Sequence, residues 1–203
     1  MSTQLRPFIL FALAFFTGAI PTAYLAGKLF KGLDIREHGS GNVGATNAFR
    51  VLGRKIGVFV FVLDFLKGFL PAFFLAKWMG IVNLEPGEAA LWIGIGAILG
   101  HVFTPFLRFK GGKGIATGGG VLCAAFPLLF LCVVFIWTVV FLMTRLVSFS
   151  SLSSLIGLVF LSFLFRNGTS VTLLFLGVSI FIFWTHRENI RRLIQGQEQK
   201  VNR

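Results

Sequence analysis

The chain has 203 residues, of which 56% are hydrophobic and only 13% are charged, and 26 of them are phenylalanine. A soluble domain carries about 25% charged residues, so this composition excludes an ordinary soluble protein and indicates a membrane protein. The formal net charge is +12, but the basic residues are scattered over short loops, which argues against a nucleic-acid partner. Cys123 and Cys132 fall in apolar segments and are expected to be small buried hydrophobes.

Long apolar runs follow one another along most of the chain. They predict helices at 8–29, 56–78, 88–107, 114–126, 128–144, 149–165 and 169–185. A helix needs about 20 residues to span a bilayer, with a range of roughly 17–25. The first three segments meet this length, and the last three are short but possible. The segment 114–126 is too short by itself and ends at Pro127, so we expect a half-helix buried within the bundle.

The distribution of Lys and Arg predicts the orientation, because cytoplasmic loops retain basic residues. With every segment crossing, one side of the membrane receives the loops 30–55, 108–113 and 145–148 and the tail from His186, and these hold most of the basic residues. The other side receives Arg6, Lys77 and Arg166. We therefore predict an all-α polytopic membrane protein with about seven transmembrane helices. The N-terminus is expected outside and the C-terminus in the cytoplasm, in a single domain spanning 1–203.

The first polar motif is GSGNVGATNAFR, from Gly39 to Arg50. It formally matches G-x-G-x-x-G, but that pattern signals a dinucleotide only between a strand and a helix, and no strand pattern is nearby. A glycine-rich turn that enters a helix still presents N–H groups to an anion, and a guanidinium suits phosphate. The alternative is a polar interfacial loop before a helix. The candidate binding residues are Ser40, Gly41, Asn42, Val43, Gly44, Thr46, Asn47 and Arg50.

The second motif is RFKGGKGIAT, from Arg108 to Thr117. It lacks the spacing of a Walker loop, yet a Gly-Gly-Lys-Gly turn allows the backbone to approach a phosphate while a lysine supplies charge. The alternative is an ordinary basic loop. The candidates are Gly111, Gly112, Lys113, Gly114 and Thr117. His101 precedes this loop and is either a buried core histidine or a residue that orients the loop.

Two further polar clusters follow. His186 and Asn189 share one helical face at i, i+3, although juxtamembrane basic segments also bind lipid headgroups. Arg145 with Ser148 and Ser151 is a weaker candidate. Glu188 is expected to pair with Arg187 or Arg50 and hold the tail in place.

Asp64 and Lys67 lie three residues apart within an apolar segment. An unpaired charge in lipid is costly, so we interpret them as a structural ion pair that faces the bundle. The three histidines lack H-x-x-x-H spacing, and no G-x-S-x-G motif is present, so neither a metal site nor a serine-nucleophile elbow is predicted.

Taken in order, these motifs give a specific resemblance. SGNVGATN with Arg50, GHVFTPFLRFKGGKGIAT, TRLVSFSS and HREN resemble the bacterial acyl-phosphate-dependent glycerol-3-phosphate acyltransferases, the PlsY family. The resemblance implies acyl transfer from acyl phosphate to the 1-hydroxyl of sn-glycerol 3-phosphate, which gives lysophosphatidate and inorganic phosphate without a metal or other cofactor. It also implies an inner-membrane enzyme with a cytoplasmic active site, supplied by acyl-phosphate synthesis and followed by lysophosphatidate acylation.

The resemblance also assigns roles. Lys113 with its flanking glycines would hold the phosphate of glycerol 3-phosphate, and Ser40, the 41–46 backbone and Arg50 would meet the acyl phosphate. Arg145, Ser148 and Ser151 would complete the phosphate site, and His186 and Asn189 would contact glycerol hydroxyls or orient the attacking one. His101 is counted with the substrate-binding residues. The general base stays open between His186 and a substrate phosphate oxygen.

Two other classes compete with this prediction. An organic-phosphate transporter would place basic residues near the bilayer midplane, in helices broken at corresponding positions of two related halves. A noncatalytic membrane scaffold would leave the two glycine-rich motifs unexplained. The basic motifs here gather at one predicted face, and the halves show no repeat, which favours the enzyme.

Overall fold

A computed structural model of the chain describes residues 5–79 and 84–201, and every regular element in that part is helical. Five of the described helical segments are long and apolar enough to cross a membrane, and the bent pair α9 (Thr169–Thr185) and α10 (Arg187–Ile194) adds a sixth. The predicted all-α multi-pass membrane fold is confirmed. The number of spans and the orientation remain predictions.

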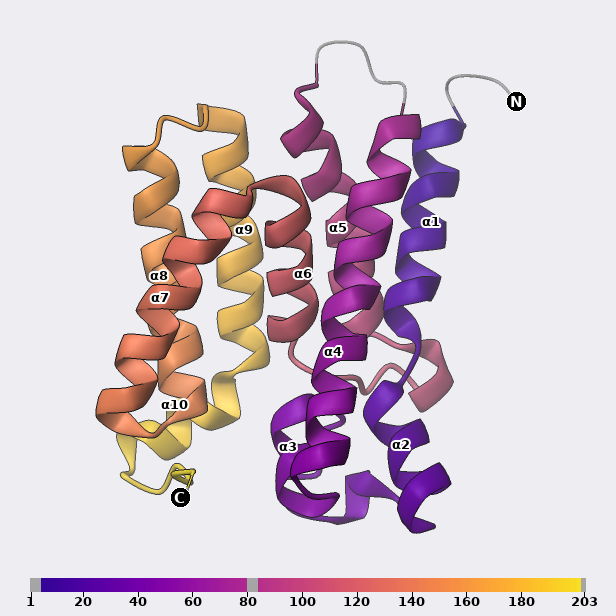
Figure 1. Cartoon of the computed structure of the whole chain (residues 1–203), viewed down its shortest axis with the longest axis vertical. Coiled ribbons are helices and arrows are strands. Elements are labelled where there is room, and N and C mark those ends of the chain that lie inside the picture. The colour runs from indigo at the N-terminus through magenta and orange to yellow at the C-terminus, as the bar shows by residue number, and fades with distance from the viewer. Residues whose placement is uncertain (1–4, 80–83, 202–203) are drawn as a thin grey trace. The chain divides into compact units, whose positions relative to one another are not determined.

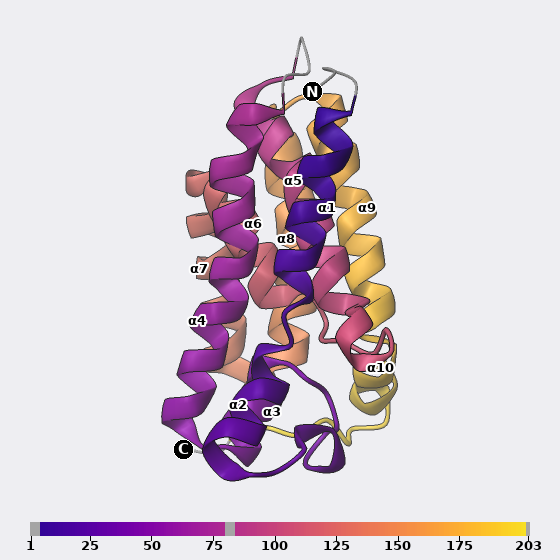
Figure 2. The same ribbon diagram turned by 90° about the vertical axis from the view of Figure 1, so that its right-hand side faces the viewer.

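The chain divides into two compact units, residues 1–125 and 126–203. The helices of the first unit are α1 (Arg6–Ala19), α2 (Thr22–Lys31), α3 (Ala45–Val51), α4 (Arg54–Leu70), α5 (Pro86–Val102) and α6 (Ile115–Ala125). α1 packs along α5, and α6 contacts both α4 and α5. Figures 1 and 2 show α2 and α3 at the end of this unit that lies away from the beginning of α1.

Glycines permit these helices to approach closely. A Cβ atom on Gly100 would overlap the carbonyl of Phe15, and one on Gly18 would overlap the carbonyl of Ala97. On the other side of the unit, a Cβ on Gly120 would overlap the carbonyl of Phe65. Small residues at such contacts are typical of helices that associate in membranes, where close backbone packing replaces the hydrophobic effect.

The first apolar segment, predicted as one helix over 8–29, is interrupted at Ile20–Pro21, between α1 and α2. Pro21 has no N–H group to continue the helical ladder. The freed carbonyls receive donors from distant helices: Thr104 Oγ1 donates to the Ala19 oxygen at 2.6 Å, and Lys67 Nζ to the Ile20 oxygen at 3.0 Å. A helix break at membrane depth requires such partners, because lipid offers none.

The second unit contains α7 (Pro127–Thr144), α8 (Val147–Leu164), α9 and α10. α8 lies between α7 and α9, and α10 contacts both α8 and α9. α8 is rich in buried serines, and the hydroxyls of Ser150, Ser151 and Ser154 donate back to carbonyls of the preceding turn, as Ser150 does to Leu146 at 2.8 Å. α10 turns away from α9 by 65°, and His186 lies at the bend.

Candidate active site

The first glycine-rich loop is closed by the side chain of Asn47, which is 2% exposed. Its amide Nδ2 donates to the carbonyls of Ile35 and His38 at 3.2 and 3.0 Å, and its Oδ1 accepts the backbone N–H of Ser40 at 2.9 Å. Both amide hydrogens therefore have partners within the loop. We infer that Asn47, expected to bind substrate, instead holds the loop in shape.

The same contacts limit which backbone N–H groups of this loop are available to the predicted anion. The N–H of Ser40 is taken by Asn47, and the N–H of Gly41 donates to the His38 carbonyl at 3.1 Å. Gly39 and Gly41 have φ of 61° and 69°, values that L-residues with side chains rarely adopt. The N–H groups from Asn42 to Thr46 are those left for an anion. Arg50 lies in the last turn of α3 and is exposed.

An ion pair stands at the beginning of this loop. Arg36 donates to both oxygens of Asp34, from Nε at 3.0 Å and from Nη2 at 2.7 Å. The hydrogen bond from the Arg36 side chain lowers the pKa of Asp34 to about 2. Arg36 also lies over the ring of Tyr24, 5.0 Å from its centroid, which ties the loop to α2.

The second glycine-rich loop is fastened to the end of α5. Gly111 N–H donates to the Val102 carbonyl at 2.9 Å, and Gly112 N–H to the His101 carbonyl at 3.1 Å. A Cβ on Gly111 would overlap the His101 carbonyl, and one on Gly112 would overlap the imidazole Nε2 of His101. These two glycines are therefore required by packing. Lys113 is half-buried, and Gly114 has φ of 85°.

His101 belongs to a buried polar group in the first unit. The predicted pairing of Asp64 with Lys67 is present at 2.8 Å, and the Nδ1 atom of His101 lies 3.7 Å from Asp64 Oδ1. Thr22 donates to the same carboxylate oxygen at 2.5 Å. The ring that packs against Gly112 thus lies beside the ion pair whose Lys67 donates at the break between α1 and α2, but its Nδ1 forms no hydrogen bond among the described residues. Thr117 is fully buried in α6, where a Cβ on Gly68 of α4 would overlap its carbonyl.

In the second unit, the structure brings together two of the predicted residues around a carboxylate that was not predicted. Ser148 Oγ donates to Glu198 Oε1 at 2.7 Å, and Asn189 Nδ2 donates to the same oxygen at 2.6 Å. Arg192 Nε donates to Glu198 Oε2 at 2.7 Å. Burial raises the pKa of Glu198, but these three hydrogen bonds outweigh it and lower the pKa below its ordinary value.

His186 is buried at the bend between α9 and α10, with 3% of its surface exposed. Its Nδ1 atom lies 2.9 Å from the carbonyl oxygen of Ile182. A carbonyl only accepts, so Nδ1 carries the hydrogen and the neutral ring has its lone pair on Nε2. This tautomer is the one that a proton acceptor acting through Nε2 needs.

The remaining predicted residues differ in their surroundings. Ser151 donates to the Val147 carbonyl at 2.9 Å and accepts Trp137 Nε1 at 3.1 Å, so its hydroxyl joins α7 to α8. Arg145 is half-buried with φ of 61°, and its carbonyl accepts the N–H of Val201 at 3.0 Å. Glu188 is exposed and forms no ion pair among the described residues. We expected Glu188 to hold the tail in place, but Glu198 forms the contacts that do so.

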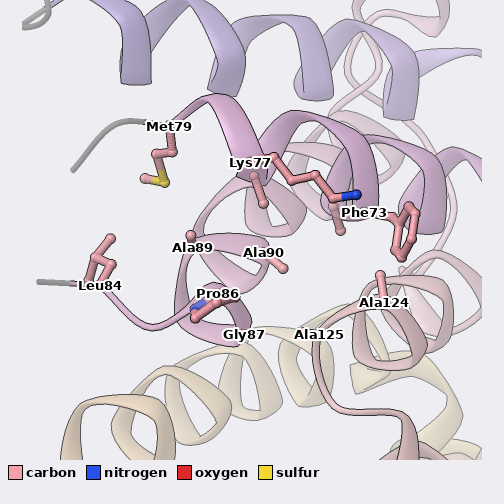
Figure 3. A pocket seen from close by; sticks show the side chains of 12 residues that line it. Phe73, Lys77, Met79, Leu84, Pro86, Gly87, Ala89, Ala90, Ala124 and Ala125 are labelled. Atoms are coloured by element: carbon pink, nitrogen blue, oxygen red, sulfur yellow. The ribbon is translucent and has the colours of Figure 1, made fainter. Parts of the chain in front are cut away.

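One pocket of about 530 Å³ lies elsewhere in the first unit. Figure 3 shows mainly apolar side chains around it, with the Lys77 amine directed toward Phe73. Its lining includes Pro86 at the beginning of α5, whereas the second glycine-rich loop follows the other end of that helix. The pocket is therefore separate from the second glycine-rich loop. Among the described residues, no group of three His, Cys, Asp or Glu side chains is arranged to hold a metal ion.

Sequence reasoning missed Glu198, Thr104 and Thr22. Thr104 bonds to a carbonyl at the break between α1 and α2, and Thr22 bonds to the carboxylate of Asp64. Both partners are distant in sequence, so no local pattern predicts these contacts. Glu198 stands in a polar tail that resembles solvated chain. The sequence gives only a weak indication of Glu198, which is the acidic residue that follows Arg191, Arg192 and a glycine.

Comparison with known proteins gives a consistent result. Residues 8–196 match the model of the glycerol-3-phosphate acyltransferase family. The chain is 45% identical over 193 residues to a glycerol-3-phosphate acyltransferase of Bacillus subtilis, covering 95% of this chain and 96% of the relative. It is 43% identical over 198 residues to one of Aquifex aeolicus, covering 97% and 100%.

Two solved structures share the fold. Both are of PlsY, an integral membrane glycerol 3-phosphate acyltransferase, one in its glycerol 3-phosphate form and one in its lysophosphatidic acid form. The first superimposes with a TM-score of 0.88 at 39% identity, covering 97% of this chain and 96% of the other, and the second with 0.86 at 38%, covering 97% and 95%. On these matches, the chain belongs to the glycerol-3-phosphate acyltransferase family and is an integral membrane enzyme of the PlsY type.

Proposed function

We propose that this enzyme transfers a fatty acyl group from acyl phosphate to the 1-hydroxyl of sn-glycerol 3-phosphate. The products are lysophosphatidate and inorganic phosphate. The enzyme then acts between reactions that make acyl phosphates and reactions that acylate lysophosphatidate. Its basic loops argue for an active site at the cytoplasmic face of the bacterial inner membrane.

The structure of the first glycine-rich loop is the main support for acyl phosphate as the acyl donor. Asn47 fixes the loop through three hydrogen bonds, which leaves the consecutive N–H groups of residues 42–46 for an anion, with Arg50 one turn further along. A rigid backbone site with a guanidinium suits a small phosphate group.

The proposed roles follow the surroundings of each side chain. Lys113 supplies charge to the phosphate of glycerol 3-phosphate, while Gly111 and Gly112 set its position by resting on His101. Ser40 and Arg50 serve the acyl phosphate. Arg145 adds charge near the phosphates, and Ser148 and Asn189, which share Glu198 as a partner, contact the glycerol hydroxyls.

The chemistry is a direct displacement. The 1-oxygen of glycerol 3-phosphate forms a bond to the acyl carbonyl carbon, and the bond from that carbon to the phosphate oxygen breaks. The hydroxyl proton passes to a phosphate oxygen, and hydrogen phosphate leaves. Acyl phosphate is already activated, so the protein mainly positions two anions and balances their charge. No acyl-enzyme is formed.

The test uses purified protein in lipid nanodiscs with palmitoyl phosphate and glycerol 3-phosphate. We expect stoichiometric release of phosphate and formation of lysophosphatidate. Parallel reactions receive palmitoyl-CoA or palmitoyl-acyl carrier protein as the donor. Turnover with either of these donors and none with palmitoyl phosphate would overturn the proposed donor while leaving the acyltransferase intact.

Substitution of His186 tests whether His186 itself or a substrate phosphate oxygen accepts the proton. If a substrate phosphate accepts the proton, His186→Gln should raise the KM for glycerol 3-phosphate more than it lowers kcat. A loss of kcat by about three orders of magnitude with unchanged KM would instead make His186 the general base. Mass spectrometry of the quenched enzyme provides the second check, because an acyl adduct on Ser40 or Cys123 would contradict direct attack.

A further inference from the structure

The chain folds back after α10 and returns to the beginning of α8. Gly196 has φ of 66°, and the N–H of Gln197 donates to the Arg192 carbonyl at 2.8 Å, which is how a glycine commonly ends a helix. Four residues further on, the Val201 N–H donates to the Arg145 carbonyl at 3.0 Å. These bonds fix the path of the tail on both sides of Glu198.

The side chain of Glu198 is enclosed within this return, whereas the residue as a whole is half-buried. Its side chain is 7% exposed, and its two oxygens accept from Ser148, Asn189 and Arg192 at 2.6–2.7 Å. Hydrogen bonds to an ionised group are stronger than those between neutral groups. A carboxylate with three such donors is a fixed part of the second unit.

The contacts of Glu198 determine which hydrogen-bonding groups Ser148 and Asn189 present to a substrate. A serine hydroxyl has one hydrogen, and Ser148 gives it to Glu198, so toward any other group the same oxygen acts as an acceptor. An ionised carboxylate only accepts, so it requires the Nδ2 side of the Asn189 amide and turns Oδ1 the other way. A glycerol hydroxyl, which donates, is matched by these acceptors, whereas Ser148 has no hydrogen left to donate to a phosphate oxygen.

We infer that Glu198 is a positioning residue of the acyl-transfer site, which acts through Asn189 and Ser148 to orient the glycerol moiety of glycerol 3-phosphate. The inference rests on the function proposed above. Glu198 itself touches no reacting atom. It sets which face of the amide and which lone pairs of the hydroxyl meet the substrate, and its charge neutralises Arg192.

A competing role for Glu198 is that of a plug, in which its carboxylate occupies the place of a substrate phosphate. The arrangement disfavours this role. A plug must leave in every catalytic cycle, and leaving would break three charge-assisted bonds and expose Arg192 without its partner. The match to the family model ends at residue 196, two residues before Glu198. The positioning role proposed for Glu198 therefore belongs to the tail beyond the matched residues.

The experiment compares Glu198→Ala and Glu198→Gln with a control, Glu37→Gln, which removes the same charge from an exposed position. We expect Glu198→Ala to raise the KM for glycerol 3-phosphate about ten- to hundredfold, as the loss of one charge-assisted bond predicts. The KM for acyl phosphate should stay within about twofold of wild type, because the effect is confined to the acceptor side. Glu198→Gln keeps one acceptor oxygen, so its effect should be smaller.

A double-mutant cycle with Ser148→Ala provides the readout that a merely structural role would not change. If Glu198 acts through Ser148, Glu198→Ala should cost clearly less in the Ser148→Ala background than in wild type. Thermal unfolding identifies variants that fail to fold. If Glu198→Ala is one of them, Glu198→Gln carries the same comparison.

Three results would overturn the inference: a lowered KM for glycerol 3-phosphate, which identifies a plug; equal increases in both KM values; or additive effects in the cycle. Failure of the donor proposal is recognised separately. In that case, wild-type protein releases no phosphate from palmitoyl phosphate, and the KM for glycerol 3-phosphate is measured with whichever acyl donor supports turnover.

Discussion

The first glycine-rich loop and the C-terminal tail, one in each unit, hold their polar residues by different means. In the first unit, the loop from Gly39 onward is closed by a neutral amide, Asn47, whose partners are all backbone groups no more than 12 residues away. In the second unit, Ser148 is held by a carboxylate 50 residues away in sequence. The first arrangement is local and carries no charge. The second depends on one ionised group and on the return of the tail, so the two units should fail under different perturbations.

The largest effect is expected from Asn47→Asp. The substitution keeps the size of the side chain but turns an oxygen toward the carbonyls of Ile35 and His38, which then have no donor. With each lost buried bond costing about 1–3 kcal/mol, acyl transfer should fall about a hundredfold or more, and the melting temperature should fall too. Asn167→Asp is the matched control, since Asn167 forms a single bond of 3.4 Å through its side chain. Near-normal rates in Asn47→Asp would show that the loop does not depend on this amide.

A second, smaller effect tests the support of the GGKG loop. Gly112→Ala places a methyl group against the His101 ring, whereas Gly111→Ala places one against a backbone carbonyl. Both should reduce the rate about tenfold or more through displacement of Lys113. Adding His101→Ala should restore part of the activity of Gly112→Ala but none of Gly111→Ala. Equal rescue of both, measured as kcat/KM for glycerol 3-phosphate, would contradict the proposed contact.

A third prediction uses pH to separate the two units. The pKa of Glu198 is lowered in the folded protein, so its contribution is complete above its unfolded pKa of about 4.3 and is lost as the pH falls through the lower folded value. The difference in melting temperature between wild type and Glu198→Gln should therefore be constant from about pH 7 to 5 and should shrink toward pH 3. The difference between wild type and Asn47→Ala should stay flat, because an amide does not titrate. A Glu198→Gln difference that persists undiminished at pH 3 would mean that the carboxylate charge is not what stabilises the tail.

The smallest effect is expected from Asp34→Asn, next to the first loop. The Arg36 partner lowers the pKa of Asp34 to about 2, so this pair persists at any pH at which the enzyme is assayed and weakens only as the pH falls below about 4. Ion pairs at the protein surface contribute little to stability. We expect an acyl-transfer rate within about twofold of wild type. A loss as large as that of Asn47→Asp would show that the loop is anchored from its beginning instead.

The helices themselves were largely predictable. The apolar runs at 56–78, 88–107 and 128–144 agree with the observed helices to within a few residues, because length and hydropathy determine what crosses a membrane. The break at Ile20–Pro21 was not predicted, although Pro21 marks it, since the break is stable only with donors from Thr104 and Lys67. A sequence shows the missing N–H of a proline but not the distant side chain that compensates for it.

The candidate residues were found by composition, but their partners were not. Asn47 and Gly112 were both selected as groups for a phosphate, and the structure gives each a partner within the protein, in the loop carbonyls and in the His101 ring. Glycine and asparagine serve tight backbone packing as readily as ligand binding, and one sequence cannot separate the two uses. Glu198 was missed because a short polar tail carries no period and no motif.

The break between α1 and α2 has a consequence for how the protein is made. The carbonyls of Ala19 and Ile20 obtain their donors from α4 and from the turn after α5, and both are synthesised later than the first span. Until those segments enter the bilayer, the first span must stay beside water or the translocation machinery, or remain one unbroken helix that opens afterwards. Its final shape is therefore acquired late during biogenesis, when the third span joins it.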